Sequence, residues 1–313
     1  MRKIKIIGYG TYLPSNTIQF GDQTRHRIID NETQIDMSVK ACVKALEVAK
    51  LDISEIDLII SASAVMAQPL PATSCLIHER IAKEYPIPAI DINTSCSSFL
   101  TALDIASHYI ELNTYKNILI VSCDICSRGL NENQKESYEL FSDGAAAVIV
   151  TKTDENIGIT DSMQKTYSDG THLTEIRGGG TLEPGYKFIE QNRDDYLFDM
   201  KGKEILLTTA RIVPNFLDEL LDRNKMTIDD IDLIIPHQAS KALGMIMSRF
   251  NIPKEKYIDW VNEYGNMVSA SRPFVLCKLL ENGELKDKHM LGRVLLLPFG
   301  RAACGRSFRR VPG

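Results

Sequence analysis

One segment of the chain occurs twice, and this internal repeat limits the possible folds more than any other feature of the sequence. Residues 53–60 read Ile-Ser-Glu-Ile-Asp-Leu-Ile-Ile, and residues 228–235 read Ile-Asp-Asp-Ile-Asp-Leu-Ile-Ile. An amphipathic helical pattern precedes each copy, at 43–51 and at 213–221. Each copy therefore predicts a helix followed by a buried strand.

Two weaker matches follow at nearly the same spacing. The run Ile-Leu-Ile-Val at 118–121 corresponds to Val-Leu-Leu-Leu at 294–297, and the small-residue turn at 91–98 corresponds to the turn at 264–271. Three landmarks in the same order are better explained by duplication than by chance.

The duplication predicts an α/β fold of two similar halves, residues 1–152 and 153–313, each with a mixed sheet covered by helices. A hydrophobic content of 44% and a charged content of 25% are typical of a soluble protein with a sizeable core. A net charge of −5 gives no reason to expect nucleic acid as a partner. No window approaches the roughly 20 apolar residues of a membrane span. Seven irregularly spaced cysteines argue against a disulfide framework, so we expect a cytoplasmic protein.

The turn that contains Cys96 is the strongest candidate for catalysis. An apolar, strand-like run ends at 91–98 in small polar residues, and an amphipathic helical pattern follows. A thiol at a helix N-terminus is favoured as thiolate by the helix dipole and the unpaired N–H groups, which can also receive an oxyanion. The alternative is a small buried cysteine at a tight turn, without a chemical role.

Two polar residues of the second half occupy similar positions. His237 directly follows the strand-like run that ends at Pro236, and Asn266 lies in the turn that corresponds to that of Cys96. Each residue could be structural, the histidine as a hydrogen-bonded core residue and the asparagine as part of a Gly-Asn turn. Because site residues of α/β folds gather at strand ends, we expect Cys96, His237 and Asn266 to converge on one crevice.

Together these features resemble the β-ketoacyl-acyl-carrier-protein synthase III family of the thiolase superfamily. The resemblance covers nearly the whole chain, and its motifs lie at 91–100, 140–147, 198–204, 236–239 and 264–266. It implies the five-layered α-β-α-β-α thiolase fold, a homodimer, and an acyltransferase of fatty-acid or related acyl-chain biosynthesis. It also implies an acyl-CoA or acyl carrier donor, malonyl-acyl carrier protein as extender, and CoA and phosphopantetheine thioesters as substrates without a metal or redox cofactor.

The resemblance also assigns roles to particular residues. Cys96 would carry the acyl group, and His237 and Asn266 would donate hydrogen bonds to the enolate formed when malonyl thioester loses carbon dioxide. The backbone N–H groups of Cys96 and Arg301 would hold the oxyanion of the acyl group. Arg301 replaces a glycine of the family.

Several departures from the family pattern concern the substrates. Leu13 and Pro14 lead directly to Arg25 and Arg27, without the longer segment whose tryptophan stacks on the CoA adenine. The single tryptophan, Trp260, lies elsewhere. We therefore expect Arg25 and Arg27 to contact phosphates, and acyl-CoA to be a less efficient donor than in ordinary family members.

Three further positions bear on the acyl pocket and on docking. Leu70 replaces an aromatic residue that often closes the acyl pocket of the partner subunit. Ser240 replaces an asparagine of the family motif, and Lys241 follows close to a docking arginine of the family. The apolar run at 118–121 is expected to form the dimer interface, because it needs cover on both faces.

Two other functions remain open. One is a starter-loading acyltransferase of specialised metabolism that uses the same cysteine with another acceptor. The other is a non-catalytic partner subunit with a ketosynthase fold, against which the intact Cys96, His237 and Asn266 argue.

Overall fold

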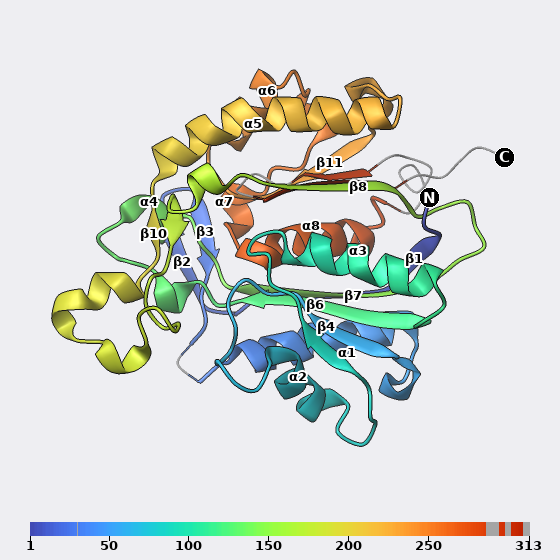
Figure 1. Cartoon of the computed structure of the whole chain (residues 1–313), viewed down its shortest axis with the longest axis horizontal. Coiled ribbons are helices and arrows are strands. Elements are labelled where there is room, and N and C mark those ends of the chain that lie inside the picture. The colour runs from blue at the N-terminus through green and yellow to red at the C-terminus, as the bar shows by residue number, and fades with distance from the viewer. Residues whose placement is uncertain (30, 286–293, 298–301, 309–313) are drawn as a thin grey trace.

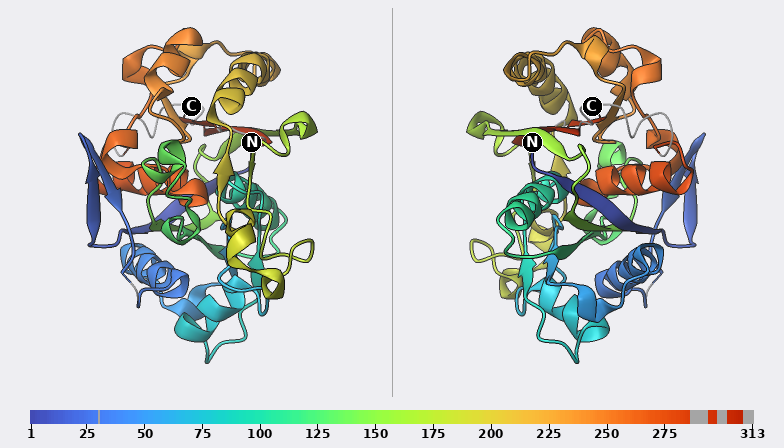
Figure 2. Two further views of the ribbon diagram at one scale, coloured as in Figure 1. Left: turned by 90° about the vertical axis from the view of Figure 1, so that its left-hand side faces the viewer. Right: turned by 90° about the vertical axis from the view of Figure 1, so that its right-hand side faces the viewer.

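The structure is a computed structural model that describes residues 1–29, 31–285, 294–297 and 302–308, with the backbone alone for the last two segments. Five layers alternate between helices and sheets, as Figure 1 shows from α5 and α6 at the top to α1 and α2 at the bottom. Helices α3 and α8 form the middle layer between the two sheets (Figure 2). This is the α-β-α-β-α arrangement that the sequence predicts.

The first sheet has five strands in the order β1-β7-β6-β4-β5. Strand β4 runs parallel to β6 and β5, and β7 runs antiparallel to β1 and β6. The bounds are β1 Ile4–Tyr12, β7 Gly144–Lys152, β6 Asn117–Asp124, β4 Leu58–Ser61 and β5 Ala89–Asp91.

The second sheet has the order β11-β12-β13-β8 and the same directions, with β11 parallel to β12 and both remaining pairs antiparallel. An isolated parallel bridge between Ile234 and Tyr257 stands where β5 stands in the first sheet. The bounds are β11 Leu233–Pro236, β12 Val294–Leu297, β13 Ala302–Phe308 and β8 Ile159–Thr166. The two sheets thus have equivalent topologies, as a duplication predicts.

The helices pack on the sheet faces, and short elements connect the layers. The longer helices are α1 Gln34–Ala49, α2 Thr73–Ile81, α3 Ser98–Glu111, α5 Gly202–Arg223, α6 Leu243–Arg249 and α8 Ser271–Glu281. The shorter elements are α4 Lys135–Tyr138, α7 Val261–Tyr264, the hairpin β2 Thr17–Phe20 with β3 Gln23–His26, and the pair β9 Thr174–Glu175 with β10 Asp199–Met200. The β2–β3 hairpin stands at one flank of the molecule (Figure 2). Among the described residues, no helix is long and apolar enough to cross a membrane.

The repeated segment folds in the same way in both halves. Each copy opens with a capping box, in which Asp52 pairs with Glu55 and Thr227 pairs with Asp230 across a short 3₁₀ turn. The strand that follows is buried on both faces, because the helices of two layers cover it. Ile60 faces the middle helix layer, whereas its neighbour Ile59 faces α1 and α2.

The prediction that residues 118–121 form the dimer interface is wrong. Residues 118–121 lie in β6, at the centre of the first sheet between β7 and β4. Their lack of alternation arises because helix layers of the same chain cover both faces. The strand with a free edge at this end of the sheet is β5.

Candidate active site

Cys96 lies in a tight turn between β5 and α3. The preceding residue, Ser95, has φ +53°, which few residues other than glycine adopt. Two hydrogen bonds hold this conformation: the Asn93 Oδ1 accepts from Ser95 N at 2.9 Å, and Thr94 N donates to the Ser98 Oγ at 3.0 Å. The turn places the half-buried thiol just before the first residues of a 14-residue helix.

The turn of Asn266 in the second half has the same hydrogen bonds. The Asn266 Oδ1 accepts from Val268 N at 2.8 Å, and Met267 N donates to the Ser271 Oγ at 2.9 Å. Val268 has φ +48°, which is strained for a β-branched residue.

Superposition of the two turns by their hydrogen bonds pairs Asn93 with Asn266 and Cys96 with Ser269. The duplication therefore includes the geometry of the site. Both halves have an asparagine at the start of this turn, and only the first half has a cysteine where the second has Ser269.

The side chain of Asn266 is fixed in one orientation. Its Oδ1 accepts a second hydrogen bond from the Ser271 Oγ at 3.4 Å, so its Nδ2 is the group that can donate to a ligand. The backbone of Asn266 is held by Leu140 O at 2.9 Å and by Ser142 N at 3.0 Å.

His237 follows β11 at the carboxyl end of the strand and is 1% exposed. It lines a cavity of about 60 Å³, whose other walls come mainly from the first turns of α5 and from α6. Burial, with the nearby Arg272 charge, holds the pKa of His237 well below 6.5. The imidazole is therefore neutral at physiological pH and can donate one N–H. Nδ1 has no hydrogen-bond partner within the part of the chain that the structure describes.

The thiol of Cys96 differs from its expected state. Burial raises the pKa of Cys96 to about 11, with the Asp124 carboxylate also raising it and the Arg272 guanidinium lowering it. The expectation of a thiol with a lowered pKa is wrong, because desolvation of the thiolate outweighs the nearby positive charge.

Arg272 connects the candidate residues, and sequence reasoning missed it. Its side chain is fully buried, and Nη2 donates to the backbone carbonyl of Cys96. Its charge lowers the pKa values of both Cys96 and His237. Arg272 directly follows Ser271, whose hydroxyl donates to the Asn266 Oδ1. Arg272 thus links the turn of Cys96 to the segment that holds Asn266, and its charge also reaches His237.

The signal for Arg272 was present in the sequence. A single arginine stands in the apolar segment that follows the second turn, at the position where the first half has Phe99. A charged residue in a pattern that is otherwise buried needs a polar partner.

Asp124 joins segments of both halves through buried hydrogen bonds. Its carboxylate is buried and accepts hydrogen bonds from the backbone of Ala64 at 2.9 Å, Val65 at 3.0 Å and Ser269 at 2.9 Å, and from the Ser269 hydroxyl. The end of β6 is thereby joined to a loop of the first half and to the turn of Asn266.

Arg25 and Arg27 do not have the predicted role. Arg25 is fully buried and donates to the backbone carbonyls of Glu139 at 2.7 Å and Asn262 at 3.1 Å. Arg27 is 6% exposed, donates to Tyr138 O at 2.6 Å and stacks over the Tyr138 ring. Both side chains are bound within the protein, so neither is available to bind phosphates. The prediction that they contact phosphates is wrong.

The remaining predicted residues lie in different surroundings. Ser240 lines the cavity beside His237, and the exposed Lys241 pairs with Glu139 at 3.4 Å. Leu70 is 82% exposed on a surface loop and does not line this cavity. Arg301 lies outside the described residues.

Solved structures with the same arrangement define the class of protein. A 3-oxoacyl-[acyl-carrier-protein] synthase III from Aquifex aeolicus VF5 superposes with a TM-score of 0.84 at 27% identity, over 98% of this chain and 99% of that chain. The enzyme from Pseudomonas aeruginosa PAO1, with a TM-score of 0.85 at 23% identity over 100% and 99%, shares the fold. The fold is that of thiolase-like condensing enzymes.

Sequence comparisons identify the family within this class. The models for 3-oxoacyl-[acyl-carrier-protein] synthase III and for its C-terminal part match residues 90–169 and 221–301. A β-ketoacyl-[acyl-carrier-protein] synthase III of Clostridium perfringens is 32% identical over 96% of both chains. The chain belongs to the β-ketoacyl-acyl-carrier-protein synthase III family, and it is an acyltransferase of the condensing type.

Proposed function

We propose that Cys96, His237 and Asn266 carry out the decarboxylative condensation of an acyl thioester with malonyl-acyl carrier protein. The observation that carries this assignment is the pair of neutral donors that the second half supplies. His237 is buried and uncharged, and Asn266 has its oxygen tied so that its Nδ2 is left to donate. An enolate oxygen is stabilised by two such donors in a water-poor site.

In the first step, the Cys96 thiol exchanges with the donor thioester. The thiol loses its proton, its sulfur bonds to the acyl carbonyl carbon, and the carbon–sulfur bond of the donor breaks. The leaving thiolate takes up a proton, so acyl-Cys96 and a free pantetheine thiol are the products.

In the second step, malonyl thioester binds in place of the released thiol. Loss of carbon dioxide leaves an enolate whose oxygen accepts hydrogen bonds from His237 Nε2 and Asn266 Nδ2. The enolate carbon attacks acyl-Cys96, and the thiolate leaves as the β-ketoacyl thioester is released.

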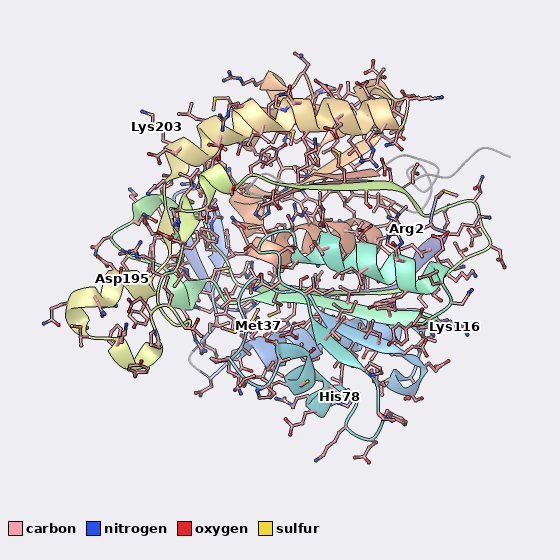
Figure 3. The ribbon with its side chains drawn as sticks, viewed as in Figure 1. Arg2, Met37, His78, Lys116, Asp195 and Lys203 are labelled. Carbon is pink, nitrogen blue, oxygen red and sulfur yellow. The ribbon has the colours of Figure 1, made fainter. Side chains whose placement is uncertain are left out.

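The cavity that reaches His237 is the proposed entrance for the pantetheine arm. Three lysines are sequence neighbours of its lining residues: Lys135 of Glu136, Lys203 of Gly202 and Lys241 of Ser240. Lys241 and Lys135 both pair with Glu139, at 3.4 and 3.6 Å, and Lys203 stands at the start of α5 (Figure 3). These cations fit a phosphate or an acidic carrier protein.

The donor is proposed to be an acyl carrier protein in preference to free CoA. The family's stacking tryptophan has no counterpart here, since Trp260 packs against the core and makes an edge contact with Tyr264. Loss of a stacking platform removes about 1–3 kcal/mol of adenine binding. Rates of Cys96 acylation from matched acyl-CoA and acyl-carrier donors test this preference. A low-micromolar Michaelis constant for acyl-CoA that depends on the adenine would contradict it.

The homodimer is also a proposal, now assigned to a different surface. Strand β5 leaves one edge unpaired, and beside it a loop exposes Val65, Met66 and Leu70 by 50%, 50% and 82%. Apolar side chains next to a free strand edge favour pairing with a second copy.

A cytoplasmic location is proposed as well, and it agrees with the six free cysteines of the described residues.

The roles of the three residues can be separated by intact-protein mass spectrometry. His237→Ala and Asn266→Ala are expected to gain one acyl mass on Cys96 but to lose decarboxylation of malonyl thioester by about 100-fold or more. The adduct should map to the peptide 91–100. If both variants lose acylation yet condense normally from pre-loaded enzyme, the assigned roles are wrong. Acylation without any malonyl decarboxylation in the wild-type protein would instead indicate a starter-loading acyltransferase.

A further inference from the structure

Arg272 is a buried charged residue that has no role in the two proposed reaction steps. It lies in the first turn of α8, where the helix dipole disfavours a cation. It is fully buried. In the duplicated turn of the first half, the corresponding residue is Phe99, which is buried in the apolar core. Neither the helix nor the repeat therefore accounts for an arginine at this position.

The contacts of Arg272 point to the nucleophile. Nη2 donates to the carbonyl oxygen of Cys96, across 176 residues of sequence. This carbonyl precedes the helical hydrogen bonds of α3, the first of which runs from Thr101 N to Ser97 O at 3.0 Å. The guanidinium thus holds the peptide plane that follows Cys96 and limits rotation of the nucleophile turn.

We propose that Arg272 is a positioning residue for the nucleophile, which holds the Cys96 carbonyl and keeps a permanent positive charge beside the thiol. The inference rests on the proposed role of Cys96 as the acylated residue. By this arrangement, the second half of the duplicated chain both supplies the enolate donors and supports the thiolate of the first half.

The other ionisable groups around Cys96 do not supply this charge. Asp124, from the end of β6, is an acid that disfavours the thiolate. Cys126, which follows β6, also interacts with Cys96 but has a pKa raised by burial. His237, from the end of β11, is kept neutral. Among the described groups that act on Cys96, Arg272 alone is a cation.

The pH dependence of Cys96 alkylation by iodoacetamide tests the proposal without any acyl donor. The variants are Arg272→Met, which removes the charge at similar length, and Arg272→Lys, which keeps the charge and loses the planar guanidinium. The alkylated peptide 91–100 is quantified by mass spectrometry, because Cys75 is also exposed. Arg272→Met is expected to react about tenfold more slowly at pH 8, with its pH profile displaced upward by about one unit.

Arg272→Lys separates the charge from the hydrogen bond. It is expected to keep the pH profile of the wild type but to be alkylated several-fold more slowly at every pH. If Arg272→Met folds and keeps the wild-type pH profile, the electrostatic role is refuted. If Arg272→Met does not fold, Arg272→Lys decides: an alkylation rate and a pH profile identical to those of the wild type would refute the positioning role.

Arg2 offers a matched control. It is another arginine that joins distant segments, with bonds to Asp104 at 2.8 Å, Ser107 at 2.7 Å and Ser162 at 3.1 Å, beside α3 (Figure 3). Arg2→Met should leave the alkylation profile of Cys96 unchanged. An equal displacement in Arg2→Met would show that loosening the contact between the halves, and not the Arg272 charge, governs the thiol. Because alkylation needs no substrate, a failure of this proposal differs from a failure of the condensation reaction.

Discussion

At the scale of single residues, the site uses burial to set protonation. Burial keeps His237 neutral, which suits hydrogen-bond donation to an enolate, and it raises the pKa of Cys96, which opposes thiolate formation. A bound thioester and the Arg272 charge must therefore offset part of the cost of ionising the thiol. The site is arranged for the condensation step more than for an always-ionised nucleophile.

The neutral state of His237 has a consequence for stability. In the unfolded chain a histidine takes up a proton below about pH 6.5, whereas the folded chain resists protonation of His237. The unfolded state then binds more protons, so stability should fall as the pH drops below 6.5, by up to about 1.4 kcal/mol per pH unit from this group. The loss should continue until the pH reaches the lowered pKa of the folded state.

Urea unfolding between pH 7.5 and 5 measures this effect. Below pH 6.5, His237→Gln should reduce the slope of the free energy of unfolding against pH. The reduction should correspond to at most one proton bound on unfolding. His108→Gln, which changes an exposed histidine of α3, serves as the control. An unchanged slope in His237→Gln would mean that the buried imidazole does not resist protonation.

At the scale of elements, close packing of α1 on β1 supports the first sheet. Strand β1 packs against α1, with Gly8 and Gly10 facing the helix. A Cβ at Gly10 would lie 2.4 Å from Ala41 O and 2.6 Å from the Lys44 Cβ. These atoms belong to the backbone of α1 and to a Cβ fixed to it, so they cannot move unless the helix moves.

Gly10→Ala is therefore expected to destabilise the protein by about 1–3 kcal/mol, because α1 must shift from the sheet. Gly185→Ala is the control, since a Cβ there meets no atom within 4 Å. Urea midpoints compare the two variants. Equal stability of both would show that α1 accommodates the methyl group without cost.

At the scale of the whole molecule, the free edge of β5 and the loop beside it form the proposed dimer surface. Leu70→Asp should leave the monomer folded, because the side chain is 82% exposed. In a dimer that covers Leu70, the buried charge should weaken association by about 2 kcal/mol or more, which is roughly a 30-fold increase in the dissociation constant.

Light scattering across a dilution series measures this change. Leu112→Asp, at a leucine that is 74% exposed at the end of α3, tests whether any new surface charge has the same effect. A wild-type protein that is monomeric at micromolar concentration would refute the dimer. An unchanged Leu70→Asp dimer would place the interface elsewhere.

The sequence alone determined the architecture, and it supplied the three residues proposed for the site. The repeat at 53–60 and 228–235 predicted two equivalent helix–strand units, because periodicity and capping are local properties of the chain. The turns of Cys96 and Asn266 were found for the same reason, since small residues between a strand and a helix constrain the backbone locally.

Only the tertiary structure decided the environment of those residues. Burial sets the pKa of Cys96, and burial depends on which layers cover the turn. The bonds of Arg25 go to carbonyls far along the chain, and Arg272 reaches a carbonyl in the other half. The run at 118–121 reads as a strand in need of cover, but whether a helix or a partner covers it depends on the sheet order. Such contacts join residues distant in sequence, and no local pattern records them.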